Sequence, residues 1–135
     1  MAIIYLAIPY RGQEYTSYCV ANIVAARLIQ AGNSVFSPIS HGHAITRNTG
    51  ERIDEKTWQD VDIEILKRCD VVAVVKLDGW ERSLGVAEEM TEADGMCIPV
   101  IYIDPTWYVS REQIEKWRQL DGTYELVEVA SDAKP

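Results

Sequence analysis

The sequence predicts a doubly wound α/β domain, in which helices cover both faces of a mostly parallel sheet. Five short runs of β-branched and other apolar residues alternate with longer amphipathic segments, which is the pattern of an α/β domain. The run Val71–Val75 is apolar at every position. Such a run suits a central parallel strand that is buried on both faces.

The predicted elements follow from apolar spacing and from residues that stop or cap helices. The predicted strands are residues 3–7, 35–37, 71–77, 100–103 and 124–129. The predicted helices are residues 15–30, 56–68, 84–94 and 111–120. Gly32 should end the first helix because glycine readily adopts the left-handed conformation, and Ser110 should cap the last helix.

Two segments show no such periodicity. Residues 41–55 are polar and contain glycines, so we expect a long loop that folds over a site. Residues 131–135 read as a frayed tail, which leaves residues 1–130 as one domain. A chain of 135 residues is long enough to bury a core without disulfides.

Composition limits the partners. The net charge of −8 disfavours a nucleic-acid polymer, whose binding requires many Lys and Arg contacts to phosphates, but it leaves a mononucleotide possible. The N-terminal apolar run is too short to span a membrane and lacks the flanks of a signal peptide, so a cytoplasmic protein without a membrane partner is expected. The three cysteines are expected to be reduced, with Cys69 and Cys97 buried beside strands.

No cofactor or metal is predicted. The sequence contains neither a dinucleotide fingerprint nor a P-loop nor a nucleophile elbow. His41 and His43 lack a third ligand nearby, so a base-contacting or lid role is favoured over a metal site. The four tryptophans are interpreted mostly as core or interface residues.

Two carboxylates stand out on helical wheels. Asp62 lies inside the apolar face of its predicted helix, formed by Trp58, Val61, Ile65, Leu66 and Cys69, whereas Asp60 and Glu64 point away. Burying an aspartate requires a reason, which is either a bond to a nearby backbone loop or, as we favour, a role in a pocket.

Glu89 lies at the edge of the apolar face of the next predicted helix, while Glu88 and Glu92 should face solvent. A glutamate near a helix start is often only a favourable dipole partner. Glu89 also follows a strand and a turn, with Ser83 as N-cap and Gly85 allowing close approach of a ligand. That setting suits a nucleophile, and Arg11 would add a cation to the same rim.

These motifs resemble the nucleoside 2-deoxyribosyltransferase superfamily. The matching segments are Tyr5-Leu6-Ala7-Ile8-Pro9-Tyr10-Arg11-Gly12, Asp62 upstream of Cys69-Asp70-Val71-Val72, and Ser83-Leu84-Gly85-Val86-Ala87-Glu88-Glu89. Within the superfamily, the chain looks most similar to the deoxynucleoside 5′-monophosphate N-glycosidases and to a related family of short uncharacterised proteins. The resemblance covers residues 3–104.

The resemblance implies a five-stranded, flavodoxin-like fold and a double displacement on a nucleoside or nucleotide. Glu89 would attack the anomeric carbon, and Asp62 would orient it or protonate the leaving base. Arg11 and Ser83 would hold a 5′-phosphate, although Pro9 replaces a serine of the phosphate-preferring branch. Further substrate-binding candidates are Tyr5, Pro9, Tyr10, Gly12, Gly85 and His43. A homodimer or larger homo-oligomer is also implied. The rival hypotheses are a nucleotide or nucleotide-sugar sensor without turnover, and a structural partner protein.

Overall fold

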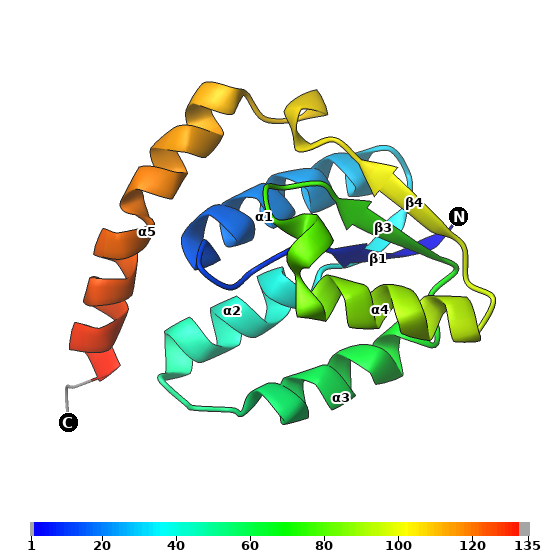
Figure 1. Ribbon diagram of the computed structural model, residues 1–135, viewed down its shortest axis with the longest axis horizontal. Helices are drawn as coiled ribbons and strands as arrows, with labels where there is room; N and C mark the ends of the chain where they lie inside the picture. The colour runs from blue at the N-terminus through cyan, green and yellow to red at the C-terminus, as the bar shows by residue number, and fades with distance from the viewer. Residues whose placement is uncertain (1, 133–135) are drawn as a thin grey trace.

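The computed structural model describes the backbone of residues 2–132 and the side chains of residues 2–121. Its sheet contains β1 (Ile3–Ala7), β2 (Ser34–Phe36), β3 (Val71–Val75) and β4 (Val100–Ile103) in the order β2-β1-β3-β4. All three neighbouring pairs are parallel. The predicted parallel α/β fold is thus confirmed, but the described residues form four strands rather than five (Figure 1).

The predicted fifth strand is wrong, because residues 124–129 belong to α5 (Arg111–Asp132). The error has a simple cause: Tyr124 and Val127 alternate with acidic residues as in a strand, but with Leu120 they also follow the i, i+4, i+7 spacing of a helix. The predicted cap is present, since the Gln113 amide donates to Ser110 Oγ over 3.1 Å. Most of the predicted tail, residues 133–135, lies outside the described residues.

The predicted loop at residues 41–55 is also wrong in its first part, which is α2 (Pro38–Thr49). Ser37 caps this helix by accepting a hydrogen bond from the Ser40 amide, and Pro38 occupies its first turn. Gly50 ends it in the left-handed conformation, with φ of 71°. Residues 51–54 connect α2 to the next helix. The polar composition of α2 hid the helical periodicity.

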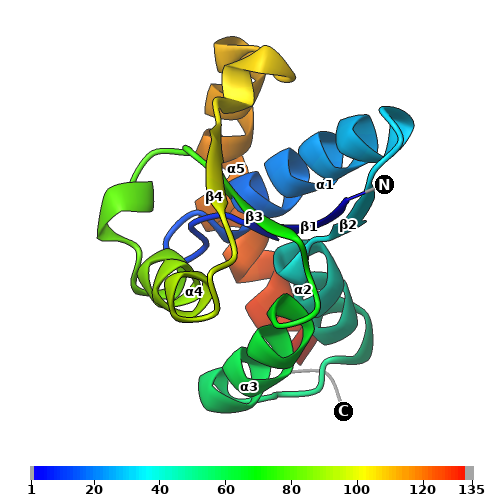
Figure 2. The ribbon, with the colours of Figure 1, turned by 90° about the vertical axis from the view of Figure 1, so that its right-hand side faces the viewer.

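The other three helices match the predictions closely. They are α1 (Glu14–Gln30), α3 (Glu55–Leu66) and α4 (Leu84–Gly95). One cluster of buried apolar residues joins α1 and α5 to one face of the sheet, and a second joins α3 and α4 to the other (Figures 1 and 2). Alternate residues of β1 serve the two clusters, with Leu6 in the first and Tyr5 in the second. The sheet is therefore covered on both faces.

Strand order locates the site. The chain moves from β1 to β2 in one direction across the sheet and from β3 to β4 in the other, so the order reverses between β1 and β3. Ligands of such sheets bind at the carboxyl ends of the strands beside this point. The segments that follow β1 and β3 should therefore form the site.

Two residues, Cys97 and Val61, are more exposed than the sequence predicts. Cys69 is buried as predicted, whereas Cys97 is exposed because it lies in the turn between α4 and β4 with a φ of 56°. Val61 is 38% exposed and thus lies outside the apolar face proposed for α3.

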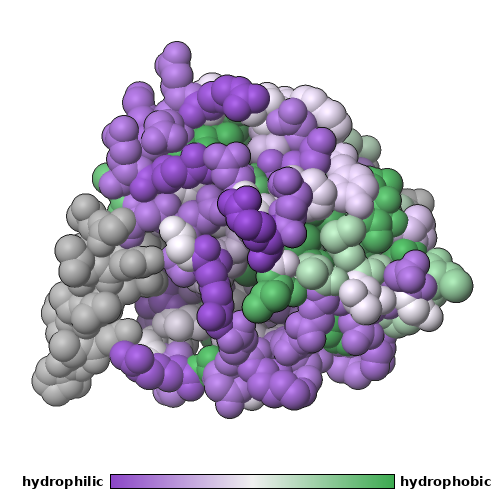
Figure 3. Space-filling model, in the orientation of Figure 1, coloured by the Kyte–Doolittle hydropathy of each residue, from purple (hydrophilic) through white to green (hydrophobic). Residues whose placement is uncertain are grey.

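The face in Figure 3 is largely hydrophilic, with apolar residues gathered at the right of the view. None of the described helices is long and apolar enough to cross a membrane.

Candidate active site

A pocket of about 910 Å³ opens at the carboxyl ends of β1 and β3. It is lined by segments that follow these strands and by α2, α3, α4 and α5. The lining residues are Leu6, Ile8, Pro9, Tyr10, Arg11, Gly12, Gln13, Pro38, Ile39, Glu55, Trp58, Gln59, Asp62, Ile63, Asp78, Gly79, Arg82, Ser83, Leu84, Gly85, Glu88, Glu89 and Arg118. Both predicted catalytic carboxylates therefore lie in one pocket.

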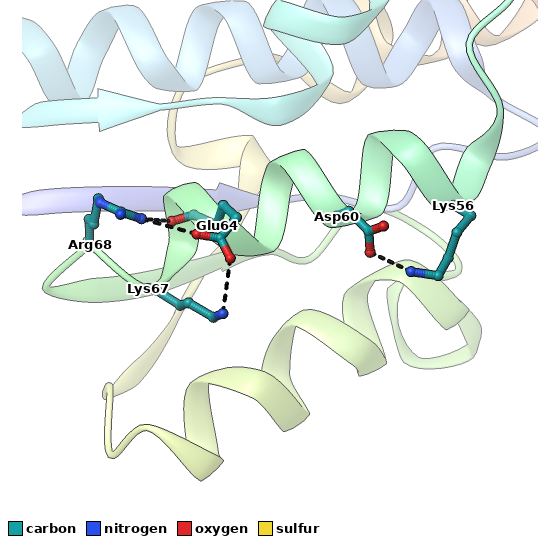
Figure 4. A network of polar contacts seen from close by, with 5 residues as sticks. All are labelled: Lys56, Asp60, Glu64, Lys67 and Arg68. Atoms are coloured by element: carbon teal, nitrogen blue, oxygen red, sulfur yellow. Dashed lines mark hydrogen bonds and ion pairs between the residues drawn. The ribbon is translucent and has the colours of Figure 1, made fainter.

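Helix α3 presents one wall of this pocket, and its charged residues Asp60 and Glu64 lie outside it. Asp54 caps the helix by accepting a hydrogen bond from the Thr57 amide over 2.7 Å. Asp60 pairs with Lys56 at 2.5 Å, and Glu64 pairs with Lys67 and Arg68 on the exposed side (Figure 4). Asp60 and Glu64 thus point away from the core, as predicted. Exposed pairs of this kind stabilise a helix only slightly.

Glu89 lines the pocket, and Tyr5 lies behind it. Tyr5 belongs to β1, and its side chain is completely buried. Its hydroxyl donates a hydrogen bond to Oε2 of Glu89, which lies in the second turn of α4. Ser83 fixes the start of this helix by accepting a hydrogen bond from the Val86 amide over 3.2 Å. Tyr5 was predicted to contact substrate, but it does not line the pocket; it holds Glu89 from behind.

Burial shifts the acid–base behaviour of the site. Desolvation raises the pKa of Glu89 to about 8, with the Tyr5 hydrogen bond opposing the shift and the charges of Asp62 and Glu88 adding to it. Desolvation alone raises the pKa of Asp62 to about 6. Burial also raises the pKa of Tyr5, so the phenol stays a hydrogen-bond donor. At neutral pH, a single proton on this pair therefore resides on Glu89 rather than on Asp62.

The Asp62 carboxyl group has a buried oxygen that no hydrogen bond from the described residues satisfies. Its Oδ1 atom is buried and has no hydrogen-bond partner among the described residues. The alternative that Asp62 bonds a nearby backbone loop is thus not what the structure shows. No hydrogen bond joins it to Glu89 within the described part of the chain, although its charge contributes to the pKa of Glu89. A buried carboxylate oxygen without a partner costs free energy, which is typical of a group kept for a ligand.

The two residues predicted to hold a phosphate, Arg11 and Ser83, both line the pocket. Arg11 lines the pocket but forms an exposed ion pair with Glu55 from the start of α3. Gly12 has a φ of 84°, which requires glycine, and its amide donates to Glu14 over 3.1 Å. An added Cβ on Gly85 would meet only Ser83 Oγ at 3.9 Å, so the first turn of α4 is open to a ligand.

Sequence reasoning missed a polar cluster that also lines the pocket. Arg118 of α5 donates to Asp78 Oδ2 over 3.1 Å, and Gln13 Nε2 donates to the Asp78 carbonyl over 2.6 Å. Arg82, in the short 3-10 helix Trp80–Arg82, lines the pocket beside them. No local signal ties residue 118 to residue 78, so only the folded chain reveals this cluster.

His43 lies behind the pocket, contrary to the prediction that it binds substrate directly. It is 6% exposed, its Nδ1 lies 2.6 Å from the Tyr10 hydroxyl, and its ring stacks on Tyr18 at 4.2 Å. Desolvation lowers the pKa of His43. Pro9 and Tyr10 line the pocket as predicted. Within the described chain, no group of three or more His, Cys, Asp and Glu side chains is arranged to hold a metal.

Together, the fold and the pocket define a parallel α/β protein with two buried carboxyl groups at the switch point of the sheet. The model of the family described as "Domain of unknown function (DUF1937)" matches residues 2–104, so the chain belongs to this family. No curated protein matches the chain.

One solved structure similar to the chain is a 2-deoxyribosyltransferase from the psychrotolerant bacterium Bacillus psychrosaccharolyticus, described as a biocatalyst for nucleoside synthesis. The two chains share 21% identity with a TM-score of 0.58. The alignment covers 89% of this chain and 90% of the other. At this identity the similarity establishes a common fold.

Proposed function

We propose that the protein breaks the N-glycosidic bond of a nucleoside or nucleoside 5′-monophosphate, with Glu89 as nucleophile. The observation that carries this proposal is the pair of buried carboxyl groups, Glu89 and Asp62, in one pocket of about 910 Å³. The volume is ample for a nucleotide. The fold shared with a 2-deoxyribosyltransferase supports the same chemistry.

In the first step, an oxygen of ionised Glu89 attacks the anomeric carbon and forms a glycosyl ester. The carbon–nitrogen bond breaks, its electron pair goes to the base, and protonated Asp62 transfers its proton to the departing nitrogen. Tyr5 stabilises Glu89 in its attacking position through their hydrogen bond. Because the proton favours Glu89 in the protein alone, it must move to Asp62 as the substrate binds.

In the second step, water or a second base attacks the same carbon, and Glu89 leaves as a carboxylate. Asp62, now ionised, accepts the proton that the attacking group loses. The enzyme thus returns to its starting protonation state. Both carboxyl groups of the pair are used twice, which accounts for two buried acids in one pocket.

The 5′ end of the substrate would lie at the start of α4, where Ser83 and the free amides of the first turn face the pocket. Arg11 would exchange its exposed pair with Glu55 for a phosphate, because such surface pairs contribute little free energy. Arg11→Ala should therefore reduce turnover of 5′-monophosphates about 10- to 100-fold while affecting nucleosides only a few-fold. Steady-state kinetics on both substrate classes measures this, and an equal effect on the two would refute the phosphate assignment.

The decisive experiment is a screen of nucleosides and 5′-monophosphates for released free base, with and without an acceptor base. Base release in water alone indicates hydrolysis, and release only with an acceptor indicates transfer. Binding of a nucleotide without any release would instead support the sensor hypothesis, which the unpaired pocket carboxylate also permits. The homo-oligomer implied by the resemblance stays a prediction, to be tested by light scattering.

A further inference from the structure

Trp58, which the sequence assigns only to the apolar face of its helix, has no role in the proposed reaction. It lies one turn before Asp62 on α3, and both side chains line the pocket. Residues four apart on a helix lie on the same face, so the indole and the carboxyl group are neighbours along one wall. A planar group that contacts the indole would therefore also be close to Asp62.

The indole is fixed from behind by α2. A Cβ added to Gly42 would lie 3.6 Å from each of three atoms of the six-membered ring of Trp58. Equal distances to Cε3, Cζ3 and Cη2 place the ring flat against the helix at this glycine. His41 contacts the same ring at an angle of 84° and a centroid distance of 6.1 Å. The aromatic surface that Trp58 gives to the pocket is thus held in place before any ligand binds.

A hydrogen-bonded polar cluster lies at another part of the pocket. Asp78, Arg118 and Gln13 are joined to one another by hydrogen bonds at the rim formed by α5 and the loops after β1 and β3. The wall beside Trp58 includes the apolar side chains Ile39 and Ile63. The pocket therefore combines a polar end for a sugar or phosphate with an aromatic and apolar wall.

We infer that Trp58 is a specificity-determining residue, the surface on which the planar leaving base stacks so that its nitrogen reaches Asp62. This inference rests on the proposed function and adds to it a stacking subsite for the base. A base has an aromatic face whatever its hydrogen-bonding edge, so the wall selects planar rings as a class. Gln59, the next residue on the same wall, offers an amide that can donate to or accept from the edge of the base.

Calorimetry with free bases tests the inference without requiring turnover. The probes are adenine, hypoxanthine, cytosine, uracil and thymine, with 2-deoxyribose 5-phosphate as the sugar control. Trp58→Leu should weaken the best-bound base about 10- to 100-fold, whereas Trp58→Phe, which keeps a ring, should weaken it at most about 5-fold. Both variants should bind the sugar phosphate as the wild type does. Trp107→Leu is the matched control, because Trp107 is 65% exposed and lies outside the pocket.

A second measurement needs no variant. The wild-type protein should bind uracil and thymine more tightly than 5,6-dihydrouracil and 5,6-dihydrothymine, whose saturated rings are not flat. Equal binding of flat and saturated rings, unchanged base affinity in Trp58→Leu, or no base binding at all would each overturn the inference. Base release is measured separately: stacking without release would refute the proposed function alone, and release with unchanged affinity in Trp58→Leu would refute the stacking wall alone.

Discussion

Two aspartates on opposite faces of the sheet each have buried oxygen atoms, but their surroundings differ. Asp121 of α5 accepts hydrogen bonds from the Tyr15 amide, the Thr16 amide and the Thr16 hydroxyl, at 2.8, 3.2 and 2.7 Å. Asp62 of α3 leaves a buried oxygen without a partner among the described residues. One carboxylate fastens two helices together, and the other faces a pocket.

The difference distinguishes a structural acid from a functional one. A carboxylate that satisfies the free amides at a helix start stabilises the fold, because those amides have no partner inside the helix. A carboxylate that is desolvated and has no hydrogen-bond partner destabilises the fold, and desolvation raises its pKa, as it does for Asp62. A raised pKa is the property that acid–base catalysis uses. The α1–α5 junction therefore stabilises the fold, whereas the α3–α4 pocket holds the acid to which we assign a part in the proposed reaction.

The largest expected effect concerns the pocket. Glu89→Gln keeps the shape and the hydrogen bond from Tyr5 but removes the nucleophile, so base release should fall about 10³-fold or more while substrate binding persists. Glu92→Gln, one turn further along α4 at an exposed position outside the main pocket, is the matched control and should change the rate less than about 3-fold. Glu88 is a poorer control, because it also lines the pocket. Full activity in Glu89→Gln would refute the assignment of the nucleophile.

The next effect concerns the structural acid. Asp121→Ala removes three hydrogen bonds and leaves the first turn of α1 uncapped, which should lower the free energy of unfolding by about 2–3 kcal/mol. Urea denaturation measures the change, with Glu112→Ala at an exposed position of α5 as the control. A loss as small as that of the control would show that Asp121 does not hold the two helices together.

The pH profile of base release should be bell-shaped. The reaction needs one proton on the pair, and the pKa values of about 6 for Asp62 and about 8 for Glu89 set its limits. The rate of release should be greatest near pH 7, about midway between these values, and should fall about tenfold per unit well outside them. A rate that stays constant from pH 5 to 9, measured with one substrate, would exclude a pair that shares one proton.

The smallest expected effect is a gain in stability. Both pKa values are raised above their unfolded values of about 4, so these two groups bind protons on folding and their contribution to stability falls as the pH rises from about 4 to 8. Glu89→Gln removes this cost and should be more stable than the wild type by roughly 1–3 kcal/mol at pH 8. The two proteins should unfold alike near pH 4, which thermal denaturation at both pH values tests.

The sequence predicts local features of this molecule well and distant ones poorly. Helical spacing placed Asp62 and Glu89 on pocket-facing sides of their helices, because period and burial are linked within a single helix. The same reasoning failed at α2, whose polar composition hid its helical periodicity, and at residues 124–129, whose spacing fits a strand and a helix alike. The sequence also suggested that His43 contacts substrate, because a sequence motif does not show whether Tyr10 or His43 lies nearer the pocket.

The bonds of Asp121 also determine when the pocket can be completed. Tyr15 and Thr16 begin the helix that follows the pocket loop 8–13, yet the carboxylate that fixes their amides comes more than 100 residues later in the chain. During synthesis on the ribosome, β1 and α1 therefore emerge long before their cap. Arg118 of α5, the helix that carries Asp121, also lines the pocket, so the described pocket is complete only when α5 has docked on α1 through the bonds of Asp121.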